Sequence, residues 1–230
     1  MRRWSRRRRR RRAAALVLSG LSVAACTERP RTYSTSAETP RLIYEDDFSG
    51  DQLSRRWRPS GPGASLQDGH LQVEGLKNHP LWLDVNLPTD VSIEFDAWTS
   101  RDEGDIKFEL AGDGRSYATT ANYKPTGYVF VFGGWNNSRS VLARLDEHDP
   151  ERITRTDRRV VPDKRYRMAI SRRGANIVWM VDGAVHLRMR DGDPLTGDGH
   201  EHFAFGGWDS AVNFDNLRIV RLSPISEESQ

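Results

Sequence analysis

The sequence predicts an all-β protein in which two antiparallel sheets pack face to face. Apolar residues recur at every second position in several segments, for example in residues 91–98, VSIEFDAW. This is the period of a strand with one buried face. The 19 glycines and 11 prolines fall mostly between such segments, and no segment shows the period of an amphipathic helix. About a dozen short strands separated by turns are typical of a β-sandwich.

The expected strands follow in chain order. Clean alternation marks residues 91–98, 106–110 and 166–170. A hairpin is predicted where Asp182-Gly183 joins residues 177–181 to 184–189, because Asp-Gly tolerates the positive φ values of a tight turn. Gln67–His70, which contains a second Asp-Gly, indicates another hairpin. The other expected strands are residues 42–48, 71–75, 81–87, 128–132, 141–145, 203–205 and 212–221.

The first 25 residues have the layout of a signal peptide, with an arginine-rich head before an apolar segment that is too short to span a bilayer. Val23-Ala24-Ala25-Cys26 resembles the lipobox of bacterial lipoproteins. The resemblance implies cleavage before Cys26 and acyl chains, palmitate among them, on its thiol and new amino terminus. The alternative is ordinary cleavage nearby and an incidental thiol. Cys26 is the only cysteine in the chain, which excludes an intrachain disulfide.

Four parts of the chain follow from this reading. Residues 1–25 are the signal peptide, 26–40 the lipidated cysteine and a flexible tether, 41–222 the β-sandwich, and 223–230 a polar tail. We therefore expect an exported protein, held at a membrane of the cell envelope by its lipid anchor without a transmembrane helix. Thr27 after the cysteine resembles lipoproteins sorted to an outer membrane.

The positive charge of the chain is concentrated in its head. The formal net charge is +3, but 9 of the 35 Lys and Arg precede the first acidic residue, Glu28. Taking these 9 from 35 leaves 26 basic against 32 acidic residues in the remainder. A basic nucleic-acid-binding body is therefore disfavoured, and no nucleic-acid partner is expected.

Four short segments of the sandwich resemble concanavalin A-like lectin/glucanase jelly rolls. They are Asp46–Gly50 (DDFSG), Leu71–Gly75 (LQVEG), Val181–Gly183 (VDG) and Asn213–Ile219 (NFDNLRI). The chain is most similar to bacterial laminin-G-like and keto-disaccharide-hydrolase-like domains. The resemblance implies a jelly-roll sandwich whose first and last strands lie together. It does not choose among the lectins, glycosidases, lyases and adhesion modules that share this fold.

A short internal repeat is the main sequence feature that indicates a function. Residues 130–138 (FVFGGWNNS) and 203–210 (FAFGGWDS) share the pattern Phe-x-Phe-Gly-Gly-Trp-(Asn/Asp). Glycine at a strand end indicates a bulge or a close approach to the backbone, and a sugar stacked on an indole is one such approach. The alternative is that both indoles pack inside the sandwich. The predicted carbohydrate-binding residues are Trp98, Trp135, Asn136, Asn137, Arg139, Trp208 and Asp209, beside the Glu147-His148 loop.

An enzyme of the glycoside hydrolase or lyase type is the second hypothesis, with Glu94, Glu147 and His148 as catalytic candidates. Glu94-x-Asp96 resembles the start of the Glu-x-Asp-x-x-Glu or Glu-x-Asp-x-Glu strand of laminarinase-type glycosidases, whose last Glu is the acid/base. Here Thr99 or Trp98 takes that last position. Glu147 or Glu201 from a loop is the remaining source of a second carboxyl group. A structural or adhesion module of the envelope is the third hypothesis.

Metal and anion sites are further possibilities. His148, His200 and His202 have ligand chemistry suited to zinc, and jelly rolls of this kind often hold a structural Ca²⁺, for which Asp102, Asp105, Asp191, Asp193 and Asp215 are candidates. The alternative for all of them is acidic turn caps and surface charge. Arginines between Trp135 and Val160 fit an acidic sugar, or else a surface of ion pairs, because acidic residues are interspersed. These arginines are Arg139, Arg144, Arg152, Arg155, Arg158 and Arg159.

Overall fold

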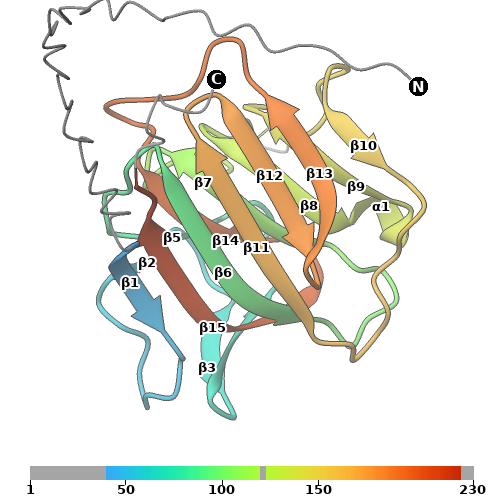
Figure 1. Ribbon diagram of the computed structural model, residues 1–230. Coiled ribbons are helices and arrows are strands. Elements are labelled where there is room, and N and C mark those ends of the chain that lie inside the picture. The colour runs from blue at the N-terminus through green and yellow to red at the C-terminus, as the bar shows by residue number, and fades with distance from the viewer. Residues whose placement is uncertain (1–39, 120–122, 224–230) are drawn as a thin grey trace, which may run out of the picture. The chain divides into compact units, whose positions relative to one another are not determined.

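The computed structural model describes residues 40–119 and 123–223. Their strands form two antiparallel sheets, one of eight strands and one of seven, stacked face to face (Figure 1). This confirms the predicted two-sheet β-sandwich. No helix in the described ranges has the length and apolar character needed to cross a membrane.

The eight-stranded sheet forms one layer, and its strands are listed in spatial order. They are β13 (Ala184–Arg190), β12 (Asn176–Val181), β11 (Tyr166–Arg173), β6 (Val91–Trp98), β15 (Ala211–Arg221), β4 (His70–Glu74) and β3 (Ala64–Gln67). β1 (Arg41–Asp46) pairs with the second half of β15, with Asp46 opposite Leu217. The first and last strands therefore lie together, as the resemblance implied.

The seven-stranded sheet forms the other layer. Its order is β10 (Ile153–Arg155), β9 (Arg139–Arg144), β8 (Tyr128–Gly133), β7 (Ile106–Gly112), β14 (His202–Gly206), β5 (Leu81–Leu83) and β2 (Trp57–Pro59). A single turn, α1 (Gly134–Asn137), follows β8. The short strands β2 and β10 were not expected from the sequence, since three residues are too few to show a period.

Residues that alternate between apolar and polar in the sequence alternate between buried and half-buried in the strands. In β6, Val91, Ile93, Phe95 and Ala97 are buried between the sheets, while the residues between them are half-buried on the outer face. Both Asp-Gly turns also form as predicted. Asp182-Gly183 and Asp68-Gly69 have positive φ at both residues, which is the geometry that joins two strands with the right-handed twist of a sheet.

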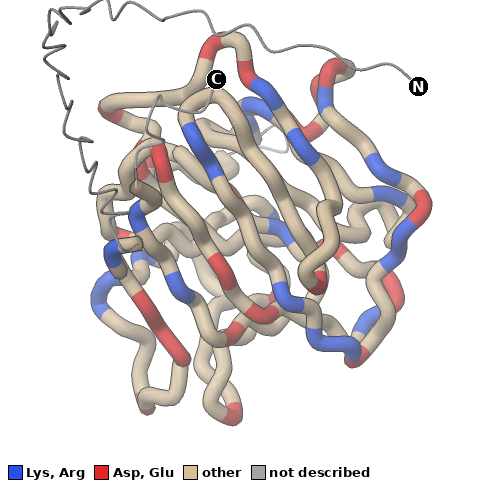
Figure 2. The backbone as a smooth tube through the Cα atoms, viewed as in Figure 1, with Lys and Arg blue, Asp and Glu red and all other residues tan. Residues whose placement is uncertain are grey.

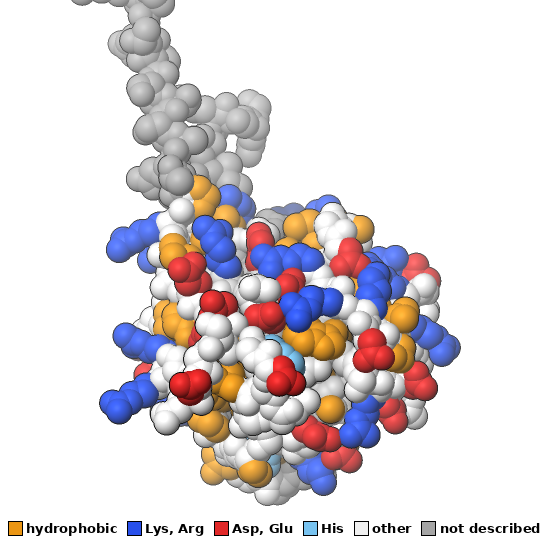
Figure 3. All heavy atoms as spheres, turned by 90° about the horizontal axis from the view of Figure 1, so that it is seen from below, with side chains coloured by type: hydrophobic (Ala, Val, Ile, Leu, Met, Phe, Trp, Pro, Cys, Tyr) orange, Lys and Arg blue, Asp and Glu red, His pale blue; other side chains and the backbone are white. Residues whose placement is uncertain are grey.

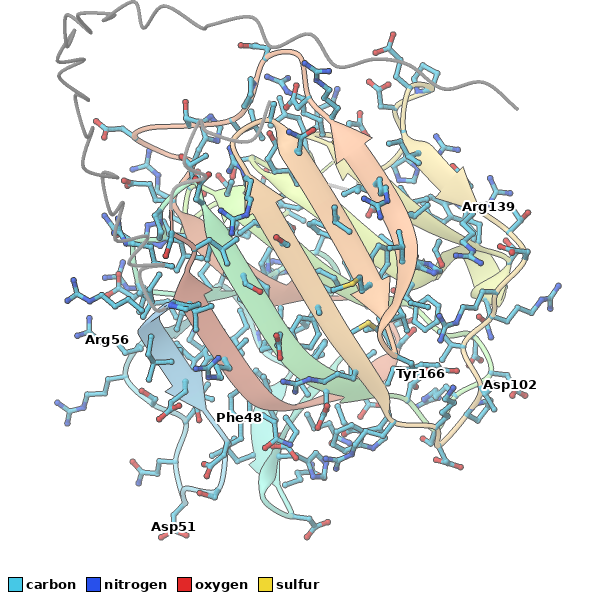
Figure 4. All side chains as sticks on the ribbon, in the orientation of Figure 1. Phe48, Asp51, Arg56, Asp102, Arg139 and Tyr166 are labelled. Atoms are coloured by element: carbon cyan, nitrogen blue, oxygen red, sulfur yellow. The ribbon has the colours of Figure 1, made fainter. Side chains whose placement is uncertain are left out.

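Aromatic rings fill the space between the layers. Phe95 of β6 packs against Phe108 of β7 at 5.1 Å and Phe205 of β14 at 5.2 Å between ring centroids, both edge-on. Phe48, labelled in Figure 4, belongs to the same core and contacts Trp57. Such a continuous buried core is the main source of stability for the fold.

Charged residues are spread over both layers and the loops, with basic and acidic positions close together (Figure 2). Many of them pair, for example Arg144 with Asp191 at 3.0 Å and Arg158 with Asp182 at 2.9 Å. Interspersed charges of both signs are typical of a surface with many ion pairs.

Candidate functional site

The two Gly-Gly-Trp segments end on either side of β7. β8 and β14 both pair with β7 in antiparallel fashion, so they run parallel to each other and end at the edge where β7 begins (Figure 1). The two Gly-Gly-Trp segments therefore place Trp135 and Trp208 just beyond the same ends of β8 and β14, the two strands that flank β7. Trp135 is 36% exposed and Trp208 49% exposed, so neither indole is packed inside the sandwich.

A cleft of about 590 Å³ lies between these two tryptophans. It opens on the face of the seven-stranded sheet that is turned away from the other layer, because Lys107 and Val131 in its floor alternate with core residues. Its lining combines two indoles with amide, carboxylate, hydroxyl and basic groups. The lining residues are Asn78, Arg101, Glu103, Asp105, Lys107, Val131, Trp135, Asn136, Glu147, His148, Trp208, Asp209 and Ser210.

Asp105 joins the two sides of the cleft. Its backbone N–H donates to the carbonyl of Gly133 at 3.0 Å, and its carboxylate accepts a hydrogen bond from the backbone N–H of Trp208 at 3.1 Å. One residue, immediately before β7, thus forms hydrogen bonds to both Gly-Gly-Trp segments. Burial raises the pKa of Asp105 to about 6, against the lowering effect of nearby Lys107.

The turn that carries Trp135 is left-handed. Trp135, Asn136 and Asn137 have φ values of 52°, 55° and 55°, a conformation that costs about 1–2 kcal/mol per residue for side chains other than glycine. The buried amide of Asn137 holds the turn, donating to the carbonyl of Val160 at 2.7 Å and accepting from the N–H of Val160 at 2.8 Å. The strain is thereby offset by contacts to the 156–165 loop.

Replacing Asn137 with alanine is expected to destabilise the protein by about 2 kcal/mol, because both backbone groups of Val160 lose their buried partner. The turn would relax, and Trp135 would lose its fixed position. Urea unfolding measures the loss of stability. The fluorescence of Trp135 is obtained as the difference between each protein and the same protein carrying Trp135→Phe, and a change in this difference on Asn137→Ala measures the loss of its fixed position. Asn136→Ala, in which an exposed side chain is removed from the same turn, serves as the matched control. Equal stability of the two variants would contradict this role of Asn137.

The floor of the cleft is a buried charge cluster on β7. Lys107, 3% exposed, contacts Glu147 Oε2 at 2.8 Å and donates to Asn78 Oδ1 at 2.9 Å. Glu109 is fully buried and accepts a hydrogen bond from Tyr123 Oη at 3.3 Å. Alternation in residues 106–110 predicted a strand with one buried face, but here the face that carries Lys107 and Glu109 is covered as well.

Burial sets the ionisation of this cluster. It raises the pKa of Glu109 to about 7, although the attraction of Lys107 opposes the shift. Burial alone would lower the pKa of Lys107, but the attraction of Glu147, Glu109 and Asp105 outweighs it, so the pKa of the ammonium group is raised. The lysine therefore stays charged while Glu109 and Asp105 titrate near neutral pH.

Six of the predicted site residues line the cleft: Trp135, Asn136, Glu147, His148, Trp208 and Asp209. Two others lie against it. Asn137 is buried and anchors the turn, and the guanidinium of Arg139 lies 5.6 Å from the centre of the Trp135 ring. The structure thus brings together most of the residues that the repeated Gly-Gly-Trp pattern indicated.

Glu94 and Trp98 are not part of this cleft, contrary to expectation. They lie on β6, on the outer face of the eight-stranded sheet, and the core separates them from the cleft. Glu94 pairs with Arg167 at 2.8 Å, and the guanidinium of Arg165 lies 3.9 Å from the centre of the Trp98 ring. Alternation predicted correctly that both face outward from the core, but it could not indicate which sheet carries the cleft.

Six lining residues were missed as site residues: Asn78, Arg101, Glu103, Lys107, Val131 and Ser210. Asp105 was expected only as a calcium candidate. For Lys107 the only sequence signal was the charged residues at alternate positions of residues 106–110, and the position of β7 between β8 and β14 is known only from the structure. Asn78, Arg101 and Glu103 come from loops whose approach to the sheet leaves no period in the sequence.

The metal candidates do not converge. The described ranges contain no group of three or more His, Cys, Asp or Glu side chains placed to hold a metal ion. His200 and His202 instead approach the carbonyls of Ala111 and Leu83, each at 3.1 Å. Among the calcium candidates, Asp105 lies in the cleft, Asp191 and Asp193 contact Arg144, and Asp215 contacts Arg165. Asp102 lies on the loop before β7 (Figure 4).

No family model and no curated protein sequence matches this chain. Solved structures do resemble it. A carbohydrate-binding module from Bacillus subtilis superposes with a TM-score of 0.52 at 12% identity, covering 72% of this chain and 95% of the module. The laminarinase of Rhodothermus marinus gives a TM-score of 0.56 at 14% identity, with 81% and 99% covered. An endo-β-1,3-glucanase from Pyrococcus furiosus gives 0.56 at 14%, with 81% and 96% covered. At these identities the likeness establishes the fold, a concanavalin A-like jelly-roll β-sandwich.

Proposed function

We propose that the cleft binds a carbohydrate. The observation that carries the proposal is the pair of partly exposed indoles, Trp135 and Trp208, held on opposite sides of one cleft. An indole offers a flat apolar surface to the C–H face of a sugar ring. Asn136, Asp209 and Ser210 supply hydrogen-bonding groups for hydroxyls beside it. The carbohydrate-binding module and the glucanases that share the fold support this choice.

Truncating either indole is expected to weaken glycan binding by about 2 kcal/mol, roughly 30-fold, as for a central aromatic anchor. The test is a glycan array followed by calorimetry with Trp135→Ala and Trp208→Ala. Trp98→Ala is the matched control, because Trp98 lies on the outer face of the other sheet. Unchanged affinity in the cleft variants, or no glycan bound by the parent protein, would contradict the proposal.

A glycoside hydrolase is the second candidate, favoured by one observation. Asp105 and Glu147 both line the cleft, and the pKa of Asp105 is raised to about 6, which suits a proton donor at mildly acidic pH. However, Glu147 is held by Lys107, which stabilises its charge without leaving it free to attack. Hydrolysis of β-glucans that disappears in Asp105→Asn and Glu147→Gln would favour the enzyme, and binding without turnover would favour the lectin-like function.

The third hypothesis, a structural or adhesion module, requires buried indoles and a surface without a cleft. The exposure of Trp135 and Trp208 favours the carbohydrate proposal over it. A structural Ca²⁺ stays a proposal, and a change in the unfolding temperature on adding Ca²⁺ or EGTA tests it.

We also propose that the protein is exported and anchored to the cell envelope through Cys26, which lies outside the described residues. The lipobox-like Val23–Cys26 segment supports this proposal. Mass spectrometry of the membrane fraction should detect an acylated amino-terminal cysteine, and Cys26→Ser should move the protein to the soluble fraction. An unmodified thiol on the exported protein would contradict the anchor.

A further inference from the structure

The six arginines between Trp135 and Val160 are not equivalent in the structure. Three of them are neutralised by carboxylates: Arg144 by Asp191 and Asp193, Arg155 by Asp157, and Arg158 by Asp182. Arg159 is exposed on the 156–165 loop. The remaining two, Arg139 and Arg152, form no ion pair within the described part of the chain.

Arg139 and Arg152 both lie against Trp135. Their guanidinium carbons are 5.6 Å and 5.7 Å from the centre of its ring, close enough for a cation–π contact. Arg139 is at the start of β9, one strand from the sheet edge (Figure 4). Arg152 comes from the loop before β10 and donates through Nη1 to the carbonyls of His148 and Asp149, at 2.7 and 3.0 Å.

Both guanidinium groups retain donors without partners. Neither Nε has a hydrogen-bond acceptor among the described residues, although both atoms are buried. A buried donor without an acceptor costs about 1–3 kcal/mol. A ligand acceptor that either Nε reaches by rotation of its side chain would therefore satisfy a donor that now lacks a partner.

The carboxylate of Glu147, which lines the cleft, already has cationic and imidazole partners. Glu147 contacts Lys107 through Oε2 at 2.8 Å and His148 through Oε1 at 3.7 Å. Arg139 and Arg152 therefore lie beside Trp135 at the border of the cleft, without a carboxylate partner among the described residues. Lys107 is paired with Glu147, and the lining of the cleft also contains the carboxyl groups of Glu103 and Asp105. The Trp208 side differs, because Asp209 lies there with Lys77 4.0 Å away. The view from below shows basic, acidic and hydrophobic side chains mixed across the surface of the molecule (Figure 3).

We propose that the glycan bound in this cleft is acidic, and that Arg139 and Arg152 bind its anionic group beside the sugar on Trp135. This inference rests on the proposed carbohydrate binding and names the class of the ligand. Guanidinium forks fit carboxylates and sulfates equally well in shape. The anionic group can therefore be the carboxylate of a uronate or the sulfate of a sulfated sugar.

The test compares three polymers: polygalacturonate, dextran sulfate and neutral laminarin. The parent protein should bind at least one of the two anionic polymers more tightly than laminarin. Arg139→Met and Arg152→Met keep the aliphatic stem against Trp135 and should each weaken that binding about tenfold, since each removes a charge-assisted contact. Arg188→Met, an exposed position of β13 in the other sheet, removes the same charge and should have no effect.

Salt gives a second readout, because added KCl should weaken anionic binding in the parent more than in the arginine variants. A preference for polygalacturonate would assign a carboxylate, and one for dextran sulfate a sulfate. Trp135-dependent binding of laminarin alone would overturn this inference and leave the proposed function intact. Failure to bind any glycan would overturn both. Folded variants with parental affinity for the anionic polymers would overturn the arginine assignment.

Discussion

Replacing Lys107 with methionine is expected to destabilise the fold by about 3–5 kcal/mol at pH 8, the usual cost of removing one partner from a buried ion pair. Lys107 is the counter-charge for Glu147, which it contacts at 2.8 Å, and it attracts Glu109 and Asp105 along the same strand. Methionine has a similar length, so packing changes little. The loss of stability therefore measures the cost of leaving the carboxylates of Glu147, Glu109 and Asp105 without their counter-charge.

The penalty should shrink as the pH falls, and the sign follows from the pKa shifts. Burial raises the folded-state pKa of Glu109 to about 7 and of Asp105 to about 6. Such groups stabilise the folded state at low pH and lose that contribution as pH rises through these values. Without Lys107 the two pKa values rise further, so both carboxyl groups are neutral at pH 5 and need no counter-charge.

Urea unfolding of the Lys107→Met protein at pH 5 and pH 8 measures the effect. The double variant Lys107→Met/Glu109→Gln, which removes one buried negative charge together with the positive one, should recover much of the stability at pH 8. A penalty of the same size at both pH values would show that the lysine acts through packing. A penalty below about 1 kcal/mol would show that the cluster is solvated.

Much of the fold could be predicted because its determinants are local. Alternation in residues 91–98 and 166–170 predicts strands with one buried face, and both Asp-Gly turns predict hairpins. These signals depend on neighbouring residues alone. The three-residue strands β2 and β10 depend on pairing with distant strands, which leaves no period to detect.

The candidate site could be predicted only in part. The repeated Gly-Gly-Trp pattern indicated two equivalent strand ends, and pairing of both strands with β7 brings them together. Glu94 and Glu109 look alike in the sequence, since each alternates with apolar residues. Only tertiary structure decides that Glu94 pairs with Arg167 on an outer face while Glu109 is buried beneath a loop near the cleft.

Replacing His186 with phenylalanine is expected to remove a large part of the acid sensitivity of the protein. His186 of β13 is 4% exposed and packs edge-on against Trp179 and Phe132, with ring centroids 4.7 and 5.1 Å away. Neither ring nitrogen has a hydrogen-bond partner among the described residues. Burial lowers the pKa of His186 to about 4, and the positive charges of Arg155 and Arg158 add to the shift.

A lowered histidine pKa has a definite consequence for stability. The unfolded chain takes up the proton near pH 6.5 and the folded protein only near pH 4, so stability falls as the pH falls from 6.5 to 4. The expected loss from this residue is about 3 kcal/mol, from 1.36 kcal/mol for each unit of pKa difference. Glu109 and Asp105 act in the opposite direction over part of this range, so the parent protein alone does not reveal the histidine.

The difference between His186→Phe and the parent protein isolates the effect. The variant should gain about 3 kcal/mol relative to the parent between pH 7 and pH 4 in urea unfolding. His148→Phe removes an imidazole that is 68% exposed and serves as the control. A constant difference across this range would mean that His186 takes up its proton in the folded core as readily as in the unfolded chain. The ring would then need an acceptor or water that its present surroundings of Trp179 and Phe132 do not provide.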